Sequence, residues 1–296
     1  MNDRGSLTRL RTNWELAARR LRLARRLRAA RPRTAPIDRR RAALGAAAAI
    51  ALIVLVGMLY DARVIAWAAS LPPGVHAGFH WITRFGQSDW LLIPSGFVVV
   101  LVALGDWRQV SRANAAAWWE IATFAAVLFI VVAASGLTTD IIKPIVGRFR
   151  PDYVTPGVFP FAPLSFGGYA HYSFPSGHAT TMAAVAAMAA FVPTVATGPI
   201  VLAAALVAIS RVIIGVHFPS DVVGGLLVGL TVGLAILRLM KEAGIVYATR
   251  QGRLRLRFGV LRRLRRQRDG YSGLFPALWT ALSPPRRERI PPPDPQ

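Results

Sequence analysis

Cysteine is absent from this chain of 296 residues, and acidic residues and lysines are scarce. Without thiols the chain can form no disulfide, no iron–sulfur cluster and no thiolate metal site. Only 14 acidic residues accompany 36 lysines and arginines, and just two of these cations, Lys143 and Lys241, are lysines. With 54% hydrophobic residues the chain is too apolar for a disordered protein, and it has no repeat period of the solenoid kind.

The cations are concentrated at the two ends of the chain. Residues 1–41 hold 14 of them with three acids, residues 238–296 hold 14 with four acids, and the apolar middle holds eight with seven. A soluble nucleic-acid-binding protein would spread its basic residues over a folded surface. Bases that flank a hydrophobic body indicate an integral membrane protein instead, with the lipid bilayer as its partner and no nucleic acid.

Six apolar segments can cross a hydrocarbon core that is about 30 Å thick. They are Ala42–Tyr60, Trp90–Gly105, Trp118–Leu137, His178–Val195, Pro199–Gly215 and Val222–Leu239. The sequence therefore predicts an all-α polytopic membrane protein, with a six-transmembrane helical bundle over 42–240. Basic tails over 1–41 and 241–296 flank this domain.

The basic tails also set the expected orientation, because cytoplasmic segments carry an excess of lysine and arginine. Both termini are expected in the cytoplasm, which an even number of spans permits. Residues 61–89, 138–177 and 216–221 then lie outside, so an active site built from them is extracytoplasmic. The first span follows a long basic tail, and we interpret it as a retained anchor in the cell (inner) membrane rather than a cleaved signal.

Some segments outside the spans have patterns of their own. Aromatic residues over 61–89 predict a helix at the membrane surface, where His76 and His80 are a weak candidate for a metal pair because no third ligand stands nearby in sequence. Apolar residues at three- and four-residue steps over 7–24 predict a basic amphipathic helix. The Pro-rich segment Pro284–Gln296 is expected to be disordered. We interpret both tails as determinants of topology without a catalytic role.

The loop before the fourth span is unusual for an outer loop because it holds Lys143, Arg148 and Arg150. Cations on that side oppose the positive-inside rule, which suggests that they hold an anion. Ser176 and Gly177 stand where the fourth span begins, and a helix start offers unpaired N–H groups to phosphate oxygens. The alternatives are an ordinary solvated loop and a serine that only caps the helix.

A second group surrounds the start of the sixth span. Arg211 ends the fifth span, and an intramembrane arginine costs at least about 2.5 kcal/mol on insertion scales, which indicates a functional role. Asp221 follows His217 by four residues and could accept a hydrogen bond from one imidazole nitrogen, leaving the other as an electron-pair donor. The alternative is a helix-capping aspartate beside a packed histidine. Topology brings both groups to one membrane face, where their joint chemistry suits phosphoryl transfer to a nucleophilic imidazole.

At these positions the chain resembles a known family. Lys143–Pro151 fits KxxxxxxRP, Pro175–His178 is PSGH, and Ser210–Asp221 fits SRxxxxxHxxxD. These are the three signatures of the type 2 phosphatidic acid phosphatase and vanadium haloperoxidase superfamily, present in the family's order and without a departure. The resemblance covers about residues 42–240 and does not extend to the tails.

The resemblance implies a role for each signature residue. His217 attacks phosphorus and forms a phosphohistidine, Asp221 orients the imidazole, and His178 acts as general acid and then as base for water. The phosphate oxygens are bound by Lys143, Arg150, Ser176, Gly177 and Arg211. Arg148, outside the fixed positions, is expected at the rim of the site. No metal or other cofactor is expected, because the cations supply the charge.

The expected function is that of an enzyme, a lipid phosphate phosphatase that hydrolyses a phosphomonoester or pyrophosphate of a membrane lipid. Phosphatidate, phosphatidylglycerol phosphate, a polyprenyl pyrophosphate and a phosphate on lipid A stay open as substrates, as does the oligomeric state. The alternatives are a transferase that passes phosphate to another lipid, a vanadate-dependent haloperoxidase and a non-catalytic lipid-binding protein. Six spans argue against the haloperoxidase, whose chemistry the resemblance places in soluble helical bundles.

Overall fold

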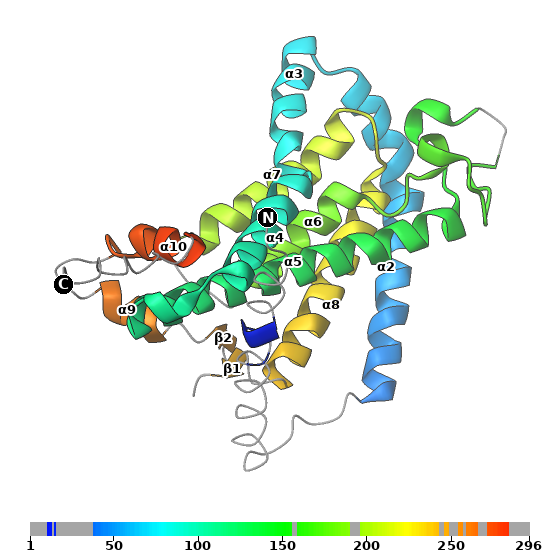
Figure 1. Ribbon diagram of the computed structural model, residues 1–296. Coiled ribbons are helices and arrows are strands. Elements are labelled where there is room, and N and C mark those ends of the chain that lie inside the picture. The colour runs from blue at the N-terminus through cyan, green and yellow to red at the C-terminus, as the bar shows by residue number, and fades with distance from the viewer. Residues whose placement is uncertain are drawn as a thin grey trace, which may run out of the picture.

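The body of the protein is a bundle of helices (Figure 1). The computed structural model describes residues 11–13, 15, 38–155, 159–189, 196–242, 246–248, 254–256, 259–265 and 271–283. The helices of the body are α2 (Arg39–Ala69), α3 (Pro73–Ile82), α4 (Asp89–Leu104), α5 (Arg112–Val146), α6 (Gly177–Ala189), α7 (Thr197–Ile213) and α8 (Pro219–Glu242). The 3₁₀ turns between them are η1 (Thr83–Gly86), η2 (Trp107–Gln109), η3 (Pro151–Tyr153) and η4 (Gly168–His171). Beyond the body lie β1 (Val246–Ala248), β2 (Leu254–Leu256), α9 (Gly259–Arg265) and α10 (Leu274–Leu282).

Each predicted span corresponds to a helix of the body. Four stretches are long and apolar enough to cross a membrane, namely α2, the stretch Pro73–Leu104, α5 and α8. Helix α7 is apolar but has 17 residues, and α6 is described over 13 residues. The structure thus confirms a helical membrane protein, and the six crossings stay a prediction. The all-α prediction misses one small element, the antiparallel ribbon β1–β2, in which Val246 pairs with Leu256.

Helix α2 runs to Ala69, well past the predicted end of the first span at Tyr60. Asp61, which the sequence suggested for an outer segment, lies inside this helix and is only 5% exposed. The helix therefore extends beyond the predicted span, and the place where it leaves the membrane stays a prediction. The Asp61 carboxylate meets Arg148, with 2.7 Å between Oδ2 and Nη2.

Small residues let α8 approach α6 closely. A Cβ atom at Gly225 would collide with the carbonyl oxygen of Ser176, and one at Gly229 would collide with the carbonyl oxygen of Thr180. Helices in membranes use such glycine positions to bring their backbones together. The contact places the first turns of α6 and α8 side by side, and each of these turns carries residues of the family signatures.

The predicted surface helix between the first two spans is α3, none of whose residues is buried. His76 Nε2 lies 3.1 Å from the carbonyl oxygen of Ala68, and within the described ranges no group of three potential ligands could hold a metal ion. The following turn η1 differs, because Thr83 and Gly86 are buried. A Cβ atom at Gly86 would lie 2.7 Å from Cδ2 of His178, so this turn packs against the start of α6.

The described C-terminal helices pack on the far end of the body. Trp118 of α5 donates its indole N–H to the carbonyl oxygen of Leu274 in α10 at 2.8 Å. Figure 1 shows α9, α10 and the ribbon at one end of the molecule and α3 with the loop between α5 and α6 at the other. Both loop and α3 therefore lie far from the basic C-terminal region.

The N-terminal tail is described only at residues 11–13 and 15, so the predicted amphipathic helix falls largely outside the described residues. The amide of Asn13 donates to the carbonyl oxygens of Ala103 and Gly105 at 2.7 and 2.9 Å. These contacts tie the tail to the end of α4. The predicted disorder of Pro284–Gln296 also concerns residues outside the described ranges.

Candidate active site

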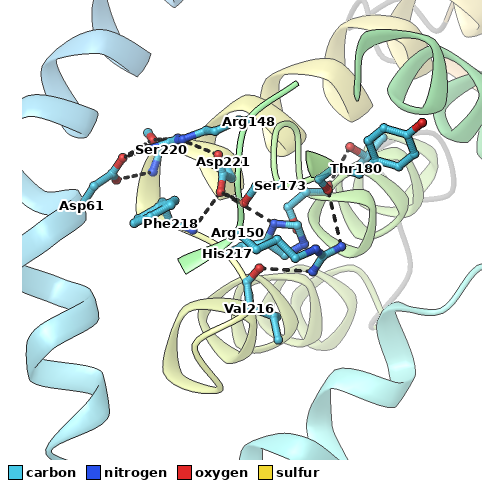
Figure 2. Close-up of polar contacts among 12 residues, drawn as sticks. Asp61, Arg148, Arg150, Ser173, Thr180, Val216, His217, Phe218, Ser220 and Asp221 are labelled. Carbon is cyan, nitrogen blue, oxygen red and sulfur yellow. Dashed lines mark hydrogen bonds and ion pairs between the residues drawn. The ribbon is translucent and has the colours of Figure 1, made fainter. Parts of the chain in front are cut away.

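Three helix ends and one loop meet at the candidate site (Figure 2). Ser176 directly precedes α6, and its N–H donates to the carbonyl oxygen of Asp221 in α8 at 3.0 Å. At the neighbouring Gly177, a Cβ atom would lie 3.7 Å from Nζ of Lys143, near the end of α5. The structure thus brings residues from all three signatures together.

His217 lies in the turn between α7 and α8 and is 2% exposed. Its N–H donates to the carbonyl oxygen of Arg211 at 3.2 Å. Its ring nitrogen Nδ1 is 3.7 Å from Oδ2 of Asp221, which is longer than a hydrogen bond. The carboxylate oxygen Oδ2 accepts from the Ser173 hydroxyl at 2.6 Å and from the Phe218 N–H at 2.8 Å.

Burial lowers the pKa of His217 to about 4, because the protonated ring would lose its hydration. The nearby cations Arg150 and Arg211 lower this pKa further, whereas Asp221 opposes them. The ring is therefore neutral at neutral pH and carries a free electron pair, as a nucleophilic imidazole must. With Nδ1 turned toward Asp221, the other ring nitrogen is the one available to a substrate.

Arg150 holds the loop around His217 in place. Its Nε, Nη1 and Nη2 donate to the carbonyl oxygens of Tyr169, Val216 and Tyr172 at 2.9, 3.2 and 3.4 Å. The guanidinium also stacks on the ring of Tyr169, with its carbon 3.7 Å from the ring centroid. Burial lowers the pKa of Arg150, yet an arginine stays charged at neutral pH. Three of its five N–H donors are used in these bonds, which leaves two for an anion.

Arg211 and Ser176 present buried polar atoms to the same region. Arg211 Nη1 donates to the hydroxyl of Thr83 at 2.6 Å. Among the described residues, no hydrogen-bond partner reaches Arg211 Nε, the Ser176 hydroxyl or His217 Nδ1. A buried polar atom without a partner costs about 1–3 kcal/mol, so this cluster suits an oxyanion that would accept from its donors. Lys143 adds a further cation and pairs with Asp140, with 2.8 Å between Nζ and Oδ1.

His178, the second residue of α6, interacts electrostatically with the other candidate residues, namely Arg211, His217, Arg150 and Lys143. Its ring packs against Gly86 of η1. A protonated imidazole in such a place can give a proton to a leaving group, and the neutral ring left behind can later take one from water. The structure therefore gathers every residue that the signatures suggested around one centre, and their chemical roles stay predictions.

Arg148 is not at the rim, as the sequence suggested, but 9% exposed in the interior. Its Nη1 donates to Oδ1 of Asp221 at 2.6 Å and to the hydroxyl of Ser220 at 2.7 Å, and its Nη2 donates to Oδ2 of Asp61 at 2.7 Å. The rim prediction was wrong because two carboxylates from α2 and α8 draw the guanidinium inward. Asp61, Ser173 and Thr83 are further site residues that the sequence analysis missed.

The remaining polar residues of the loop have local partners. The ring nitrogen Nδ1 of His171 lies 2.8 Å from the hydroxyl of Ser165, and its ring packs on Phe149 with centroids 4.3 Å apart. These contacts stabilise the loop between α5 and α6.

Comparisons with known proteins agree with the geometry. The sequence model of the PAP2 superfamily matches residues 124–245, which contain all three signatures. The chain is 35% identical to a lipid A 1-phosphatase of Rhizobium johnstonii over 66% of this chain and 79% of the relative. It is 31% identical to a decaprenylphosphoryl-5-phosphoribose phosphatase of Mycobacterium tuberculosis over 55% of this chain and 80% of the relative.

One solved structure is also similar, the transmembrane PAP2-type phosphatidylglycerolphosphate phosphatase of Bacillus subtilis. Its TM-score is 0.46 at 20% identity, over 66% of this chain and 96% of that chain.

Proposed function

This chain belongs to the PAP2 superfamily and is a membrane lipid phosphatase, and we propose that it acts at the outer membrane face through a phosphohistidine on His217. The observation that carries the proposal is the neutral, buried imidazole of His217, which lies between the carboxylate of Asp221 and the cations Arg150 and Arg211. A neutral imidazole is nucleophilic, and fixed cations stabilise the charge that develops on a transferring phosphoryl group.

In the first step, the ring nitrogen of His217 that faces away from Asp221 attacks phosphorus. The bond from phosphorus to the lipid oxygen breaks, its electron pair leaves with that oxygen, and His178 donates the proton that neutralises the new hydroxyl. In the second step, His178 takes a proton from water. The resulting hydroxide attacks phosphorus, the phosphorus–nitrogen bond breaks, and its electron pair returns to His217 while inorganic phosphate is released.

Arg150, Arg211 and Lys143 bind the equatorial oxygens in this reaction, together with the hydroxyl of Ser176 and the N–H of Gly177. The arginines offer planar forks that hold two oxygens at once, whereas the lysine supplies a point charge. Because these donors are already held by Thr83, Tyr169 and backbone carbonyls, little reorganisation is needed when the charge develops.

We infer that the substrate carries its phosphate on a sugar that is linked to a lipid. The two relatives described above are named for lipid A and for a decaprenylphosphoryl phosphoribose, and both names denote a sugar phosphate on a lipid. Aromatic side chains offer large apolar faces, on which the C–H face of a sugar ring can pack, and the loop beside Arg150 exposes Tyr153, Phe166 and Tyr169 at 51%, 82% and 58%. These side chains support a sugar ring next to the phosphate site.

The outer location of the site rests on charge and topology. Both basic tails belong in the cytoplasm by the positive-inside rule. The candidate residues lie at the ends of α5, α6, α7 and α8 that point away from α9 and α10 (Figure 1). With both termini inside, this end faces the outside of the cell membrane.

The test is phosphate release by the purified protein in detergent, with lipid A 1-phosphate, phosphatidate, phosphatidylglycerol phosphate and a polyprenyl pyrophosphate compared. We expect the sugar phosphate to be hydrolysed fastest. The variant His217→Ala should lose at least ~10²-fold in turnover, whereas His80→Ala, an exposed histidine of α3, should keep the wild-type rate.

Full activity of His217→Ala would remove the proposed nucleophile. Phosphate found on a second lipid rather than in solution would indicate a transferase. Oxidation of halide by peroxide only with added vanadate would indicate a haloperoxidase.

A further inference from the structure

A buried ion-pair cluster lies directly behind the proposed nucleophile, and the family signatures contain only part of it. Arg148 contacts Asp221 with one end of its guanidinium and Asp61 with the other, at 2.6 and 2.7 Å (Figure 2). Both carboxylates and the guanidinium are buried, with side chains at most 11% exposed. The three groups come from α2, the loop after α5 and the first turn of α8.

We propose that Asp61 and Arg148 are positioning residues for the phosphoryl-transfer step, acting on His217 through Asp221. This inference rests on the proposed function, in which His217 is the nucleophile. Arg148 uses Nη1 and Nη2 to bind the two carboxylates and Ser220, while its buried Nε has no partner among the described residues. Asp61 and Arg148 therefore act through the carboxylate of Asp221.

Three neighbouring donors fix the orientation of the Asp221 carboxylate. Its Oδ1 accepts from Arg148, and its Oδ2 accepts from Ser173 and from the N–H of Phe218. With both oxygens held, the carboxylate cannot rotate, and Oδ2 stays toward Nδ1 of His217 at 3.7 Å. A small movement of the ring would close this gap to a hydrogen bond when the ring becomes positively charged.

Asp61 also holds the start of α8 in place. Asp61 Oδ1 accepts from the N–H of Ser220 at 2.9 Å, and Oδ2 accepts from the Ser220 hydroxyl at 2.5 Å. The carboxylate therefore fixes the first turn of α8 to α2, one residue before Asp221.

The net charge of the cluster of Asp61, Arg148 and Asp221 also favours the proposed reaction. Two carboxylates share one guanidinium, so the cluster carries one negative charge in excess. The rings of Phe218 and Phe161 lie 4.3 and 5.4 Å from the Arg148 guanidinium carbon and keep water from it, which strengthens electrostatic effects. Attack on phosphorus makes the imidazole of His217 cationic, and the excess negative charge stabilises that product. Without Asp61, the remaining pair of Arg148 and Asp221 would be neutral overall.

The experiment compares Asp61→Asn with the wild type and with Asp89→Asn, which removes an exposed carboxylate at the start of α4. Asparagine keeps the shape and can still accept from Ser220, but it has no charge. We expect Asp61→Asn to lower kcat about 10- to 100-fold, less than the ~10⁴-fold of a carboxylate that touches the catalytic histidine directly.

KM and the inhibition constant of inorganic phosphate should stay within about twofold, because the donors that bind phosphate are untouched. Asp89→Asn should match the wild type in kcat. A merely structural defect would instead lower the thermal midpoint and raise KM together with the loss in kcat.

A double-mutant cycle tests whether the effect passes through Asp221. In an Asp221→Asn background, measured with enzyme in excess over substrate, Asp61→Asn should cost less than about threefold. If Asp61→Asn does not fold, Ser220→Ala is the second test. It removes the hydroxyl's bonds to Arg148 and Asp61 but no charge, so kcat should be about three- to tenfold lower and KM unchanged.

The inference is overturned if Asp61→Asn keeps the wild-type kcat, or if its loss is the same in both backgrounds. These outcomes differ from a failure of the proposed function, which would appear as a fully active His217→Ala variant or a wild-type protein that releases no phosphate.

Discussion

Replacing Arg211 by lysine isolates geometry from charge in the proposed phosphate cradle. Arg211 is 8% exposed, its Nη1 donates to Thr83 at 2.6 Å, and its Nε has no partner among the described residues. Lysine keeps the positive charge but cannot bind Thr83 and two phosphate oxygens at once. Loss of one preorganised donor costs about 10²–10³-fold in kcat. Because the charge is retained, we expect a loss of about 30- to 300-fold, which corresponds to about 2–3.4 kcal/mol.

The assay is steady-state release of inorganic phosphate by the purified variant, with kcat and KM determined separately and the thermal midpoint measured in the same detergent. The matched control is Arg84→Lys, an exposed arginine next to Thr83, which should behave like the wild type. If Arg211→Lys keeps kcat within about threefold of the wild type while folding normally, then the bidentate role of Arg211 is wrong.

Four further predictions concern His217, His178 and the contact between α6 and α8. The His217 ring should stay neutral down to about pH 5 and titrate near its lowered pKa of about 4. NMR can follow this titration, with His217→Gln used to assign the signal, and a ring that is half protonated near pH 6.5 would contradict the prediction. The unfolded histidine has a pKa near 6.5. The contribution of His217 to the free energy of unfolding should therefore be complete above pH 6.5 and decrease as the pH falls toward 4. The thermal midpoint of the wild type should fall over this range, and His217→Gln should not show this fall. His178→Ala should slow the first chemical step, measured as leaving-group release in a single turnover with enzyme in excess, about 10²–10⁴-fold for a lipid substrate but much less for p-nitrophenyl phosphate, whose leaving group needs no proton; equal losses in this step would exclude His178 as the general acid. Gly229→Val should place methyl groups against the backbone of Thr180 and so lower the thermal midpoint by several degrees. The control is Gly198→Val, where a Cβ atom has free space. Equal midpoints of the two variants would show that α6 and α8 can separate without cost.

Much of the fold could be predicted because apolar length is a strong signal. Each predicted span overlaps one helix, and the ends of helix and span differ, as at the end of α2. The burial of Asp61 could not be predicted, because its partner Arg148 is distant in sequence, and a pairing of that kind leaves no local pattern.

The candidate site divides in the same way. Side chains that touch the phosphate in the proposed reaction stand at fixed spacings, so Arg150, His178, Arg211 and His217 could be found from the sequence. Thr83 could not, because a threonine in an aromatic-rich segment gives no sign that it holds an arginine from a distant helix. The wrong interpretation of Arg148 has the same origin, since its place outside the fixed signature positions gave no sign of two carboxylate partners that are distant in sequence.

The two arginines of the loop after α5 show how position decides the role of equal charges. Arg150 donates its hydrogen bonds to backbone carbonyls, which carry no net charge, and Asp221 and Asp152 offset its charge only through space, so the cation can still attract phosphate. Arg148, two residues earlier, binds two carboxylates, so its charge is more than neutralised. His217 therefore lies between an electropositive side and an electronegative side. In the proposed reaction, the first side stabilises the phosphoryl oxygens and the second stabilises the imidazolium, so both ends of the forming phosphorus–nitrogen bond gain from one electrostatic gradient.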